Sequence, residues 1–256
     1  MIEVVGNIVL VGETGAGKSS IINMIAGVDI AETSNGAASC TFDHHDYTLP
    51  VHDQYFKIFD TMGLNEGDRG TVGHTAAIAK LYQFITHLDG QINLLVFCMR
   101  GPRIKDATHQ NWKLFHDIMC EKKVPTVLVV TGLENEDSLD SWWWNNKENF
   151  ERHDIRPDDT ACITAIRGKK LGDDRYAFDD QYEESRAKVM KLILNRALLS
   201  APRFHKTHWF YALIHPILTF FRLTKIRHRK VVRDIAAVCG LSEEQTRRLR
   251  EEFDKH

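Results

Sequence analysis

An eight-residue run near the N-terminus, Gly12–Ser19 (GETGAGKS), constrains this chain more than any other feature. It fits the pattern G-x-x-x-x-G-K-S without a mismatch, and it lies between an apolar, β-branched run at Asn7–Gly12 and a predicted helix at about Lys18–Ala26. In that context the glycines allow backbone N–H groups to point at phosphate oxygens, and the helix N-terminus adds partial positive charge. We therefore predict a phosphate-binding loop (P-loop), in which Lys18 reaches the β- and γ-phosphates of a nucleotide and Ser19 ligates Mg²⁺.

A second motif, Asp60-Thr61-Met62-Gly63, ends a predicted strand about forty residues further on. A carboxylate at the end of such a strand can hold Mg²⁺, usually through a water molecule, and the Gly63 N–H can contact the γ-phosphate. At this spacing from a P-loop, the motif favours a nucleotide-sensing segment over an ordinary strand end.

Strands and helices alternate along most of the chain. Continuous apolar runs at Ile92–Met99 and Val124–Thr131 are typical of central strands covered on both faces. Runs at Thr41–Leu49 and Tyr55–Asp60 predict a hairpin, which would place one antiparallel strand in the sheet. The remaining expected elements are helices at about 74–87, 106–121, 139–150 and 182–198, and a last strand at 161–166. The pattern predicts an α/β fold with a doubly wound, mixed but mostly parallel sheet and helices on both faces.

The composition excludes few classes of function, but it indicates the cellular compartment. The net charge of −2 gives no reason to expect a nucleic-acid partner. The five cysteines form no CxxC pair, which is typical of free thiols in a reducing compartment; they are Cys40, Cys98, Cys120, Cys162 and Cys239. The N-terminus lacks the pattern of a secretory signal, so we expect a cytoplasmic protein.

GETGAGKS followed by DTMGL resembles the septin-like branch of the G-domain GTPases, which includes the immunity-associated and chloroplast-import-receptor GTPases. The resemblance covers roughly residues 6–199. It implies a P-loop NTPase G domain that binds GTP or GDP with Mg²⁺, hydrolyses GTP slowly, and completes its site by forming a homodimer across the nucleotide.

The resemblance also assigns further positions. The threonine that ligates Mg²⁺ and contacts the γ-phosphate falls on Thr41, with Ser39 as the alternative. The guanine-reading [NT]-K-x-D element corresponds to Thr131–Glu134, where Glu134 supplies the carboxylate but Gly132 replaces the lysine that covers one face of the base. The backbone N–H of Ala165 would contact the guanine O6.

Slow hydrolysis is expected because Leu64 follows Gly63, where Ras-like proteins carry a glutamine that orients the attacking water. Any acceleration of GTP hydrolysis would then be supplied in trans, by a second molecule. The sequence does not rank the polar residues of this loop, which are Glu66, Asp68, Arg69 and His74.

The predicted site groups residues by role. Those expected to act in catalysis are Lys18, Thr41 and Gly63, and the metal ligands are Ser19, Thr41 and Asp60. Nucleotide-binding residues are Gly12, Glu13, Thr14, Gly15, Ala16, Gly17, Lys18, Ser19, Ser20, Asp60, Gly63, Thr131, Glu134 and Ala165.

Residues 201–256 are predicted to form a helical extension to a G domain at 1–200. Within it, the apolar stretch Trp209–Phe221 is followed by a basic segment and is too short to span a bilayer. Residues 205–230 would contact either a membrane surface or a protein. Near the end of the chain, Ser242 is expected to cap a last helix. Earlier in the chain, the consecutive tryptophans Trp142–Trp144 cannot all face one core, so at least one should be exposed.

Two other functions fit the same motifs. One is an ATP-using P-loop kinase or ATPase, which the missing lysine at Gly132 leaves open. The other is a nucleotide-bound scaffold that hydrolyses nothing and anchors partners through its C-terminal extension.

Overall fold

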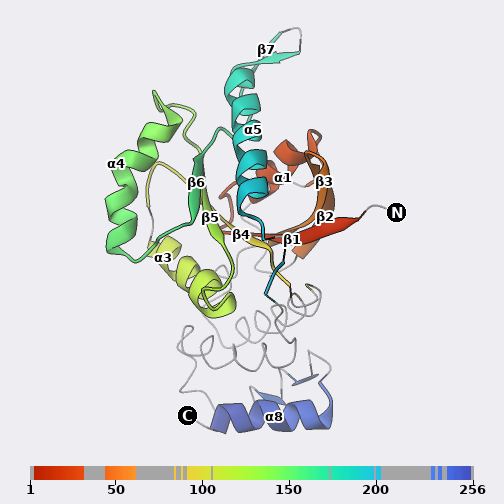
Figure 1. Cartoon of the computed structure of the whole chain (residues 1–256). Coiled ribbons are helices and arrows are strands. Elements are labelled where there is room, and N and C mark those ends of the chain that lie inside the picture. Colours follow the sequence, from red (N-terminus) through yellow and green to blue (C-terminus); the bar gives the residue numbers. More distant parts are fainter. Residues whose placement is uncertain are drawn as a thin grey trace.

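The computed structural model describes residues 3–31, 44–61, 84, 88, 91–104, 106–172, 174–198, 200–202, 232–233, 236–237 and 241–254. At its centre is a six-stranded sheet in the order β2-β3-β1-β4-β5-β6 (Figure 1). The strands are β1 (Val4–Val11), β2 (His44–Val51), β3 (Gln54–Thr61), β4 (Leu94–Arg100), β5 (Thr126–Thr131) and β6 (Asp159–Cys162). Every neighbouring pair is parallel except β2 and β3. The prediction of a mixed, mostly parallel sheet is thus confirmed.

Helices cover both faces of the sheet, as predicted. One face carries α1 (Lys18–Ala26) and α5 (Asp179–Arg196), and the other carries α3 (Asp106–Trp112) and α4 (Leu139–Arg152), as Figure 1 shows. A cation holds the first pair together: the Arg186 guanidinium on α5 donates to the carbonyl oxygen of Met24, 2.9 Å away, in the last turn of α1. A positive charge there complements the partial negative charge of the helix end.

Alternation of side chains along β1 divides the core into two layers. Val9 and Val11 pack into the cluster that includes the apolar faces of α3 and α4. Ile8 and Leu10 pack into the cluster that includes α1 and α5. All four are fully buried, and each contributes roughly 1.5–3 kcal/mol of burial free energy. Burial on both faces explains why this strand has a continuous apolar sequence.

The strand order places the end of β1 at a topological switch point. From β1 the chain passes through α1 to the β2–β3 hairpin. Strand β3 of this hairpin lies against one side of β1, and β4 lies against the other. In such sheets, ligands bind outside the carboxyl ends of the strands at this point. The P-loop, which follows β1 directly, therefore lies where a ligand is expected.

The three consecutive tryptophans separate as predicted. Trp142 and Trp143 are 4% and 9% exposed, whereas Trp144 is 69% exposed. The indole N–H of Trp142 donates to the carbonyl oxygen of Pro102, at 3.3 Å. Trp144 carries the Lys147 ammonium over its ring, 5.8 Å from the centroid.

Three local features differ from the sequence predictions. The last strand, predicted at 161–166, is β6 at Asp159–Cys162, so it begins earlier and ends four residues sooner. The helix expected at 106–121 is α-helical only to Trp112 and continues as a π-helical segment, η1 (Lys113–Met119), in which the Cys120 N–H bonds to the carbonyl of Phe115. The Trp112 and His116 rings stack there, with centroids 4.7 Å apart. A hairpin of β7 (Lys170–Gly172) and β8 (Arg175–Tyr176) was not predicted, because these short polar strands have no apolar alternation.

The last helix, α8 (Glu243–Asp254), begins with the predicted cap. The Ser242 hydroxyl accepts from the Gln245 N–H at 3.2 Å, and the Gln245 side chain accepts from the Ser242 N–H at 2.9 Å. This is a capping box. The helix buries Leu249.

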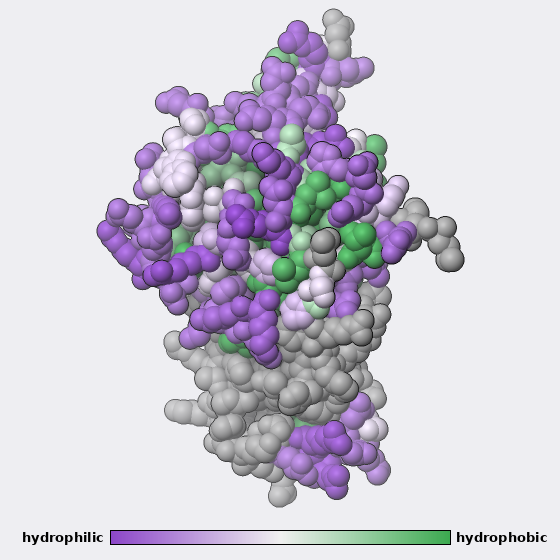
Figure 2. All heavy atoms as spheres, viewed as in Figure 1, coloured by the Kyte–Doolittle hydropathy of each residue, from purple (hydrophilic) through white to green (hydrophobic). Residues whose placement is uncertain are grey.

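The larger predictions for the C-terminal region lie beyond what the structure tests. None of the helices among the described residues is long and apolar enough to cross a membrane. Residues 205–230, to which we assign a membrane or protein contact, lie outside the described part, and the boundary at residue 200 stays a prediction. On the described surface, hydrophilic residues predominate over α4 and β7, while apolar groups gather beside α1 and β2 (Figure 2).

Candidate functional site

The P-loop crosses close to β4, and Gly12 makes this possible. Its φ is +147°, and a Cβ atom there would lie 2.1 Å from the carbonyl oxygen of Cys98. No side chain fits, so the glycine fixes how closely the loop passes over β4. Burial raises the pKa of the Cys98 thiol to about 12, which marks it as a packing residue and not a nucleophile.

Lys18 lies under the loop with only 7% of its surface exposed. Its ammonium donates to the carbonyl oxygens of Gly12 and Glu13, each at 3.0 Å. No carboxylate among the described residues pairs with it. Because a buried charge without a counter-ion is costly, this ammonium is suited to an anionic ligand such as a phosphate group.

Ser19 and Asp60, the two predicted Mg²⁺ ligands that the structure describes, are in direct contact. The Ser19 hydroxyl donates to Asp60 Oδ2 at 2.6 Å. Asp60 is 7% exposed, and its buried Oδ1 has no hydrogen-bond partner among the described residues. A neighbouring bond, from the Thr61 hydroxyl to the carbonyl of Leu10 at 2.6 Å, holds the ends of β3 and β1 together. Hard oxygen donors with one unsatisfied carboxylate atom fit Mg²⁺.

The predicted base-reading element meets the P-loop at Thr131. The buried Thr131 hydroxyl donates to the carbonyl of Ala16 at 3.0 Å. Glu134 lies three residues further on, half-buried in the turn that follows β5. The structure thus brings the P-loop and the predicted base-reading element together.

Ala165 lies in the loop that links β6 to α5, and hydrogen bonds fix this loop. The Thr164 N–H donates to the Ser185 hydroxyl at 2.9 Å. After it, the Arg167 guanidinium donates to Asp179 and Glu183, each at 2.8 Å. The Tyr176 N–H, and then the Arg167 guanidinium, hold the pKa of Asp179 below its ordinary value. Ala165 is 7% exposed, and its predicted contact with the guanine O6 stays a prediction.

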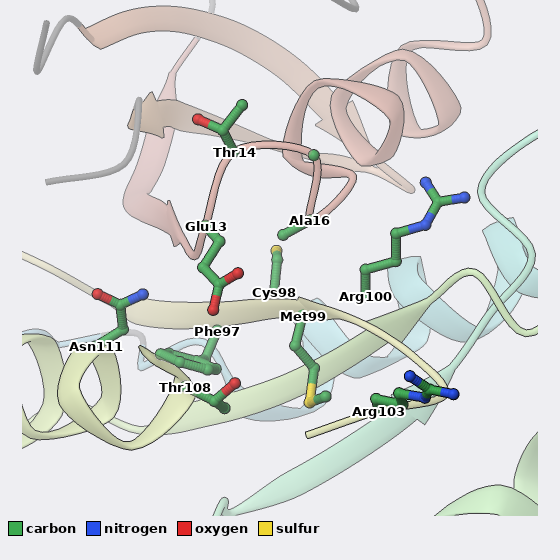
Figure 3. A pocket seen from close by; sticks show the side chains of 11 residues that line it. Glu13, Thr14, Ala16, Phe97, Cys98, Met99, Arg100, Arg103, Thr108 and Asn111 are labelled. Carbon is green, nitrogen blue, oxygen red and sulfur yellow. The ribbon is translucent and has the colours of Figure 1, made fainter. Parts of the chain in front are cut away.

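A cavity of about 200 Å³ opens beside the P-loop (Figure 3). Its walls are Glu13–Ala16 of the loop, Phe97–Arg100 of β4, Arg103, and Thr108 and Asn111 of α3. Sequence reasoning missed all of this wall except the loop. The sequence did contain one indication of this wall, namely Arg100. It is a charged residue that directly follows an apolar run, at the carboxyl edge of a parallel sheet.

Several predicted site residues lie outside the described part of the chain. They are Thr41 and its alternative Ser39, Gly63, Leu64, Glu66, Asp68, Arg69 and His74. Their roles stay predictions.

Fold and site together define a P-loop NTPase with the α/β fold of a GTPase G domain. Residues 7–132 match the model of the family described as 50S ribosome-binding GTPase. No curated protein sequence matches the chain.

Solved structures share the fold at low identity. The chain resembles Aquifex aeolicus Era bound to GDP·AlF4⁻, with 17% identity and a TM-score of 0.51; the match covers 78% of this chain and 60% of Era. This chain therefore spans less than two thirds of Era's length. It also resembles a structure of the chloroplast translocon components atToc33 and psToc159, whose dimerization is described as important for their GTPase activity, with 18% identity and a TM-score of 0.51. That match covers 78% of this chain and 86% of the other.

Proposed function

We propose that this protein is a GTP-binding molecular switch of the septin-like type, which hydrolyses GTP slowly with Mg²⁺ and faster as a homodimer across the nucleotide. The observation that carries the proposal is one juxtaposition at the carboxyl edge of the sheet. A buried, uncompensated Lys18 ammonium lies under the P-loop, and the Ser19–Asp60 pair lies at the first turn of α1.

On binding, Lys18 would exchange its two carbonyl contacts for the β- and γ-phosphates. The backbone N–H groups of the loop would hold the same oxygens, so that charge developing on them meets fixed donors. Ser19 and Asp60 would hold Mg²⁺, which neutralises phosphate charge when bound.

The base would lie at the other end of the site, beside the turn after β5 and the loop after β6, since these two strands are neighbours in the sheet. Glu134 would accept from the guanine N1–H and 2-amino group, and the Ala165 N–H would donate to O6. Thr131 supports this end by fixing the turn to the P-loop. A carboxylate acceptor favours guanine, because adenine has no N1–H or 2-amino group to donate.

Slow turnover follows from Leu64, whose side chain cannot orient a water molecule. A group supplied by a partner subunit would then raise the rate. The resemblance to translocon components with dimerization-dependent activity supports this part of the proposal.

The buried thiols of Cys98, Cys120 and Cys162 are all unpaired, which supports a reducing, cytoplasmic location. We retain membrane or protein contact through residues 205–230 as part of the proposal. The expectation of no nucleic-acid partner stays a prediction, since the matched family is described as ribosome-binding.

Measuring GTP hydrolysis at rising protein concentration tests the proposal. We expect a low rate per molecule that rises with concentration and disappears in Lys18→Ala. A rate independent of concentration would contradict the dimer. Tight GTP binding with no turnover at any concentration would favour the non-hydrolysing scaffold.

A further inference from the structure

Arg100 occupies the space that a side chain at position 132 would need. It is the last residue of β4 and pairs in register with Thr131, so it lies beside Gly132 on the neighbouring strand end. An ideal Cβ on Gly132 would be 2.9 Å from Arg100 Cγ, 3.2 Å from Nε and 3.6 Å from Cδ. The stem of Arg100 therefore runs directly over the Gly132 backbone.

Gly132 and Arg100 are consequently coupled. Gly132 has a φ of +75°, which side-chain-bearing residues rarely adopt, and any Cβ there would push the arginine stem aside. A lysine at 132 and an arginine in this pose at 100 exclude each other. The departure from the family motif at Gly132 is matched by a long cationic side chain arriving from the next strand.

The guanidinium of Arg100 is available for a ligand. The side chain is exposed, and within the described residues it forms no hydrogen bond or ion pair. Figure 3 shows it extending from the end of β4 beside Ala16 of the P-loop, whereas Arg103 lies further along the chain and points elsewhere. A planar, weakly hydrated guanidinium stacks well on aromatic rings.

We propose that Arg100 covers the face of the purine base that Gly132 leaves open. This inference rests on the proposed function, because it assumes that a guanine nucleotide binds with its base against Thr131–Glu134. The Arg100 stem and guanidinium would lie on the ring while Glu134 holds its edge. Arg100 is assigned to the base rather than to the phosphates because its stem crosses the base-reading turn.

The test separates base contact from phosphate contact by using a probe without a base. Binding of GDP and of inorganic pyrophosphate, both with Mg²⁺, is measured by calorimetry for the wild type and Arg100→Ala. We expect Arg100→Ala to bind GDP about five- to tenfold more weakly and pyrophosphate with unchanged affinity. Arg156→Ala is the matched control. Arg156 is exposed and precedes β6, so it lies at the amino ends of the strands, whereas the site lies at their carboxyl ends. Both affinities should therefore stay as in the wild type.

Three results would overturn the assignment. Equal weakening of GDP and pyrophosphate would make Arg100 a phosphate contact, and unchanged GDP binding would remove it from the site. The third result concerns Arg100→Lys, which keeps an aliphatic stem and the positive charge. This variant provides a second test in case the alanine variant misfolds. It should weaken GDP binding less than alanine does, and an equal loss would rule out covering by the stem.

Failure of the proposed function gives a different signature. If the wild type preferred ATP, guanine specificity would fail, and Arg100 would then be judged by the same comparison of ADP with pyrophosphate.

Discussion

The two ends of the site are built in different ways. The phosphate and metal end comes from one continuous motif and one residue of an adjacent strand. Its contacts are short and buried: 3.0 Å from Lys18 to the loop carbonyls, and 2.6 Å from Ser19 to Asp60. The proposed base end draws on three separate segments, which contain Arg100, Thr131–Glu134 and Ala165, and its central position, Gly132, lacks a side chain.

This difference shows where each end gets its specificity. Backbone geometry fixes the phosphate end, so glycines and a single lysine are sufficient. The base end depends on which side chains the β4–β5 register brings together. In the proposed site, Gly132 has no lysine side chain, and the Arg100 stem lies over its backbone from the neighbouring strand.

The largest effect is expected at the phosphate end, from Lys18→Ala. Loss of a buried, charge-assisted contact costs about 3–4 kcal/mol, which weakens GTP binding by two to three orders of magnitude. Calorimetry with Mg²⁺ and GTP measures this. Lys147→Ala, which changes a lysine on the surface of α4, should bind as the wild type does. Unchanged affinity in Lys18→Ala would remove the P-loop from the site.

Gly12→Ala tests whether packing against β4 shapes that end. A Cβ 2.1 Å from the Cys98 carbonyl oxygen forces the backbone to move, at about 3 kcal/mol of unfolding free energy. Gly15→Ala is the matched control, because no atom outside its two chain neighbours lies within 4 Å of its Cβ and only its φ of +75° is unfavourable, which costs about 1 kcal/mol. Urea denaturation compares the two. Equal losses would show that the close approach at Gly12 is unimportant.

For the phosphate end, the sequence predicted the residues that the structure brings together around the P-loop, which are Lys18, Ser19 and Asp60; their roles in binding stay predictions. The P-loop, its helix and Asp60 are local signals, because each depends on residues close together in the chain. Arg100 could not be assigned in the same way, since its role depends on the register between β4 and β5 and on the pose of its stem. The π-helical segment after Trp112 was also missed, because helical periodicity does not distinguish it from an α-helix.

At the base end, Glu134→Gln should reduce discrimination between GTP and ATP. The variant replaces a carboxylate, which accepts from two guanine donors, by an amide that matches them poorly. We expect GTP to bind about tenfold or more weakly, with little change for ATP. Competition binding measures the ratio. Glu136→Gln, two residues further on and exposed, is the control. A ratio that does not change would place the base elsewhere.

The smallest effect at neutral pH is expected for the substitution of Cys98, beneath the phosphate end, on the free energy of unfolding. Burial raises its pKa from the ordinary 9.0 to about 12, so above pH 9 the unfolded chain loses a proton that the folded chain keeps. Stability should therefore fall as pH rises from 9 towards 12, by up to about 1.4 kcal/mol per pH unit from this group. Cys98→Ala should fall less steeply in urea denaturation between pH 8 and 10, with no difference in slope at pH 7. Parallel curves over the whole range would show that Cys98 is not buried as described.

Calorimetric titration of the wild type with GTP, GDP and ATP in the presence of Mg²⁺ tests both ends at once. We expect GTP and GDP to bind at least about tenfold more tightly than ATP, because Glu134 matches only guanine and Arg100 covers the ring that Gly132 leaves open. ATP binding more tightly than GTP would contradict the assignment of this protein as a GTP-binding switch.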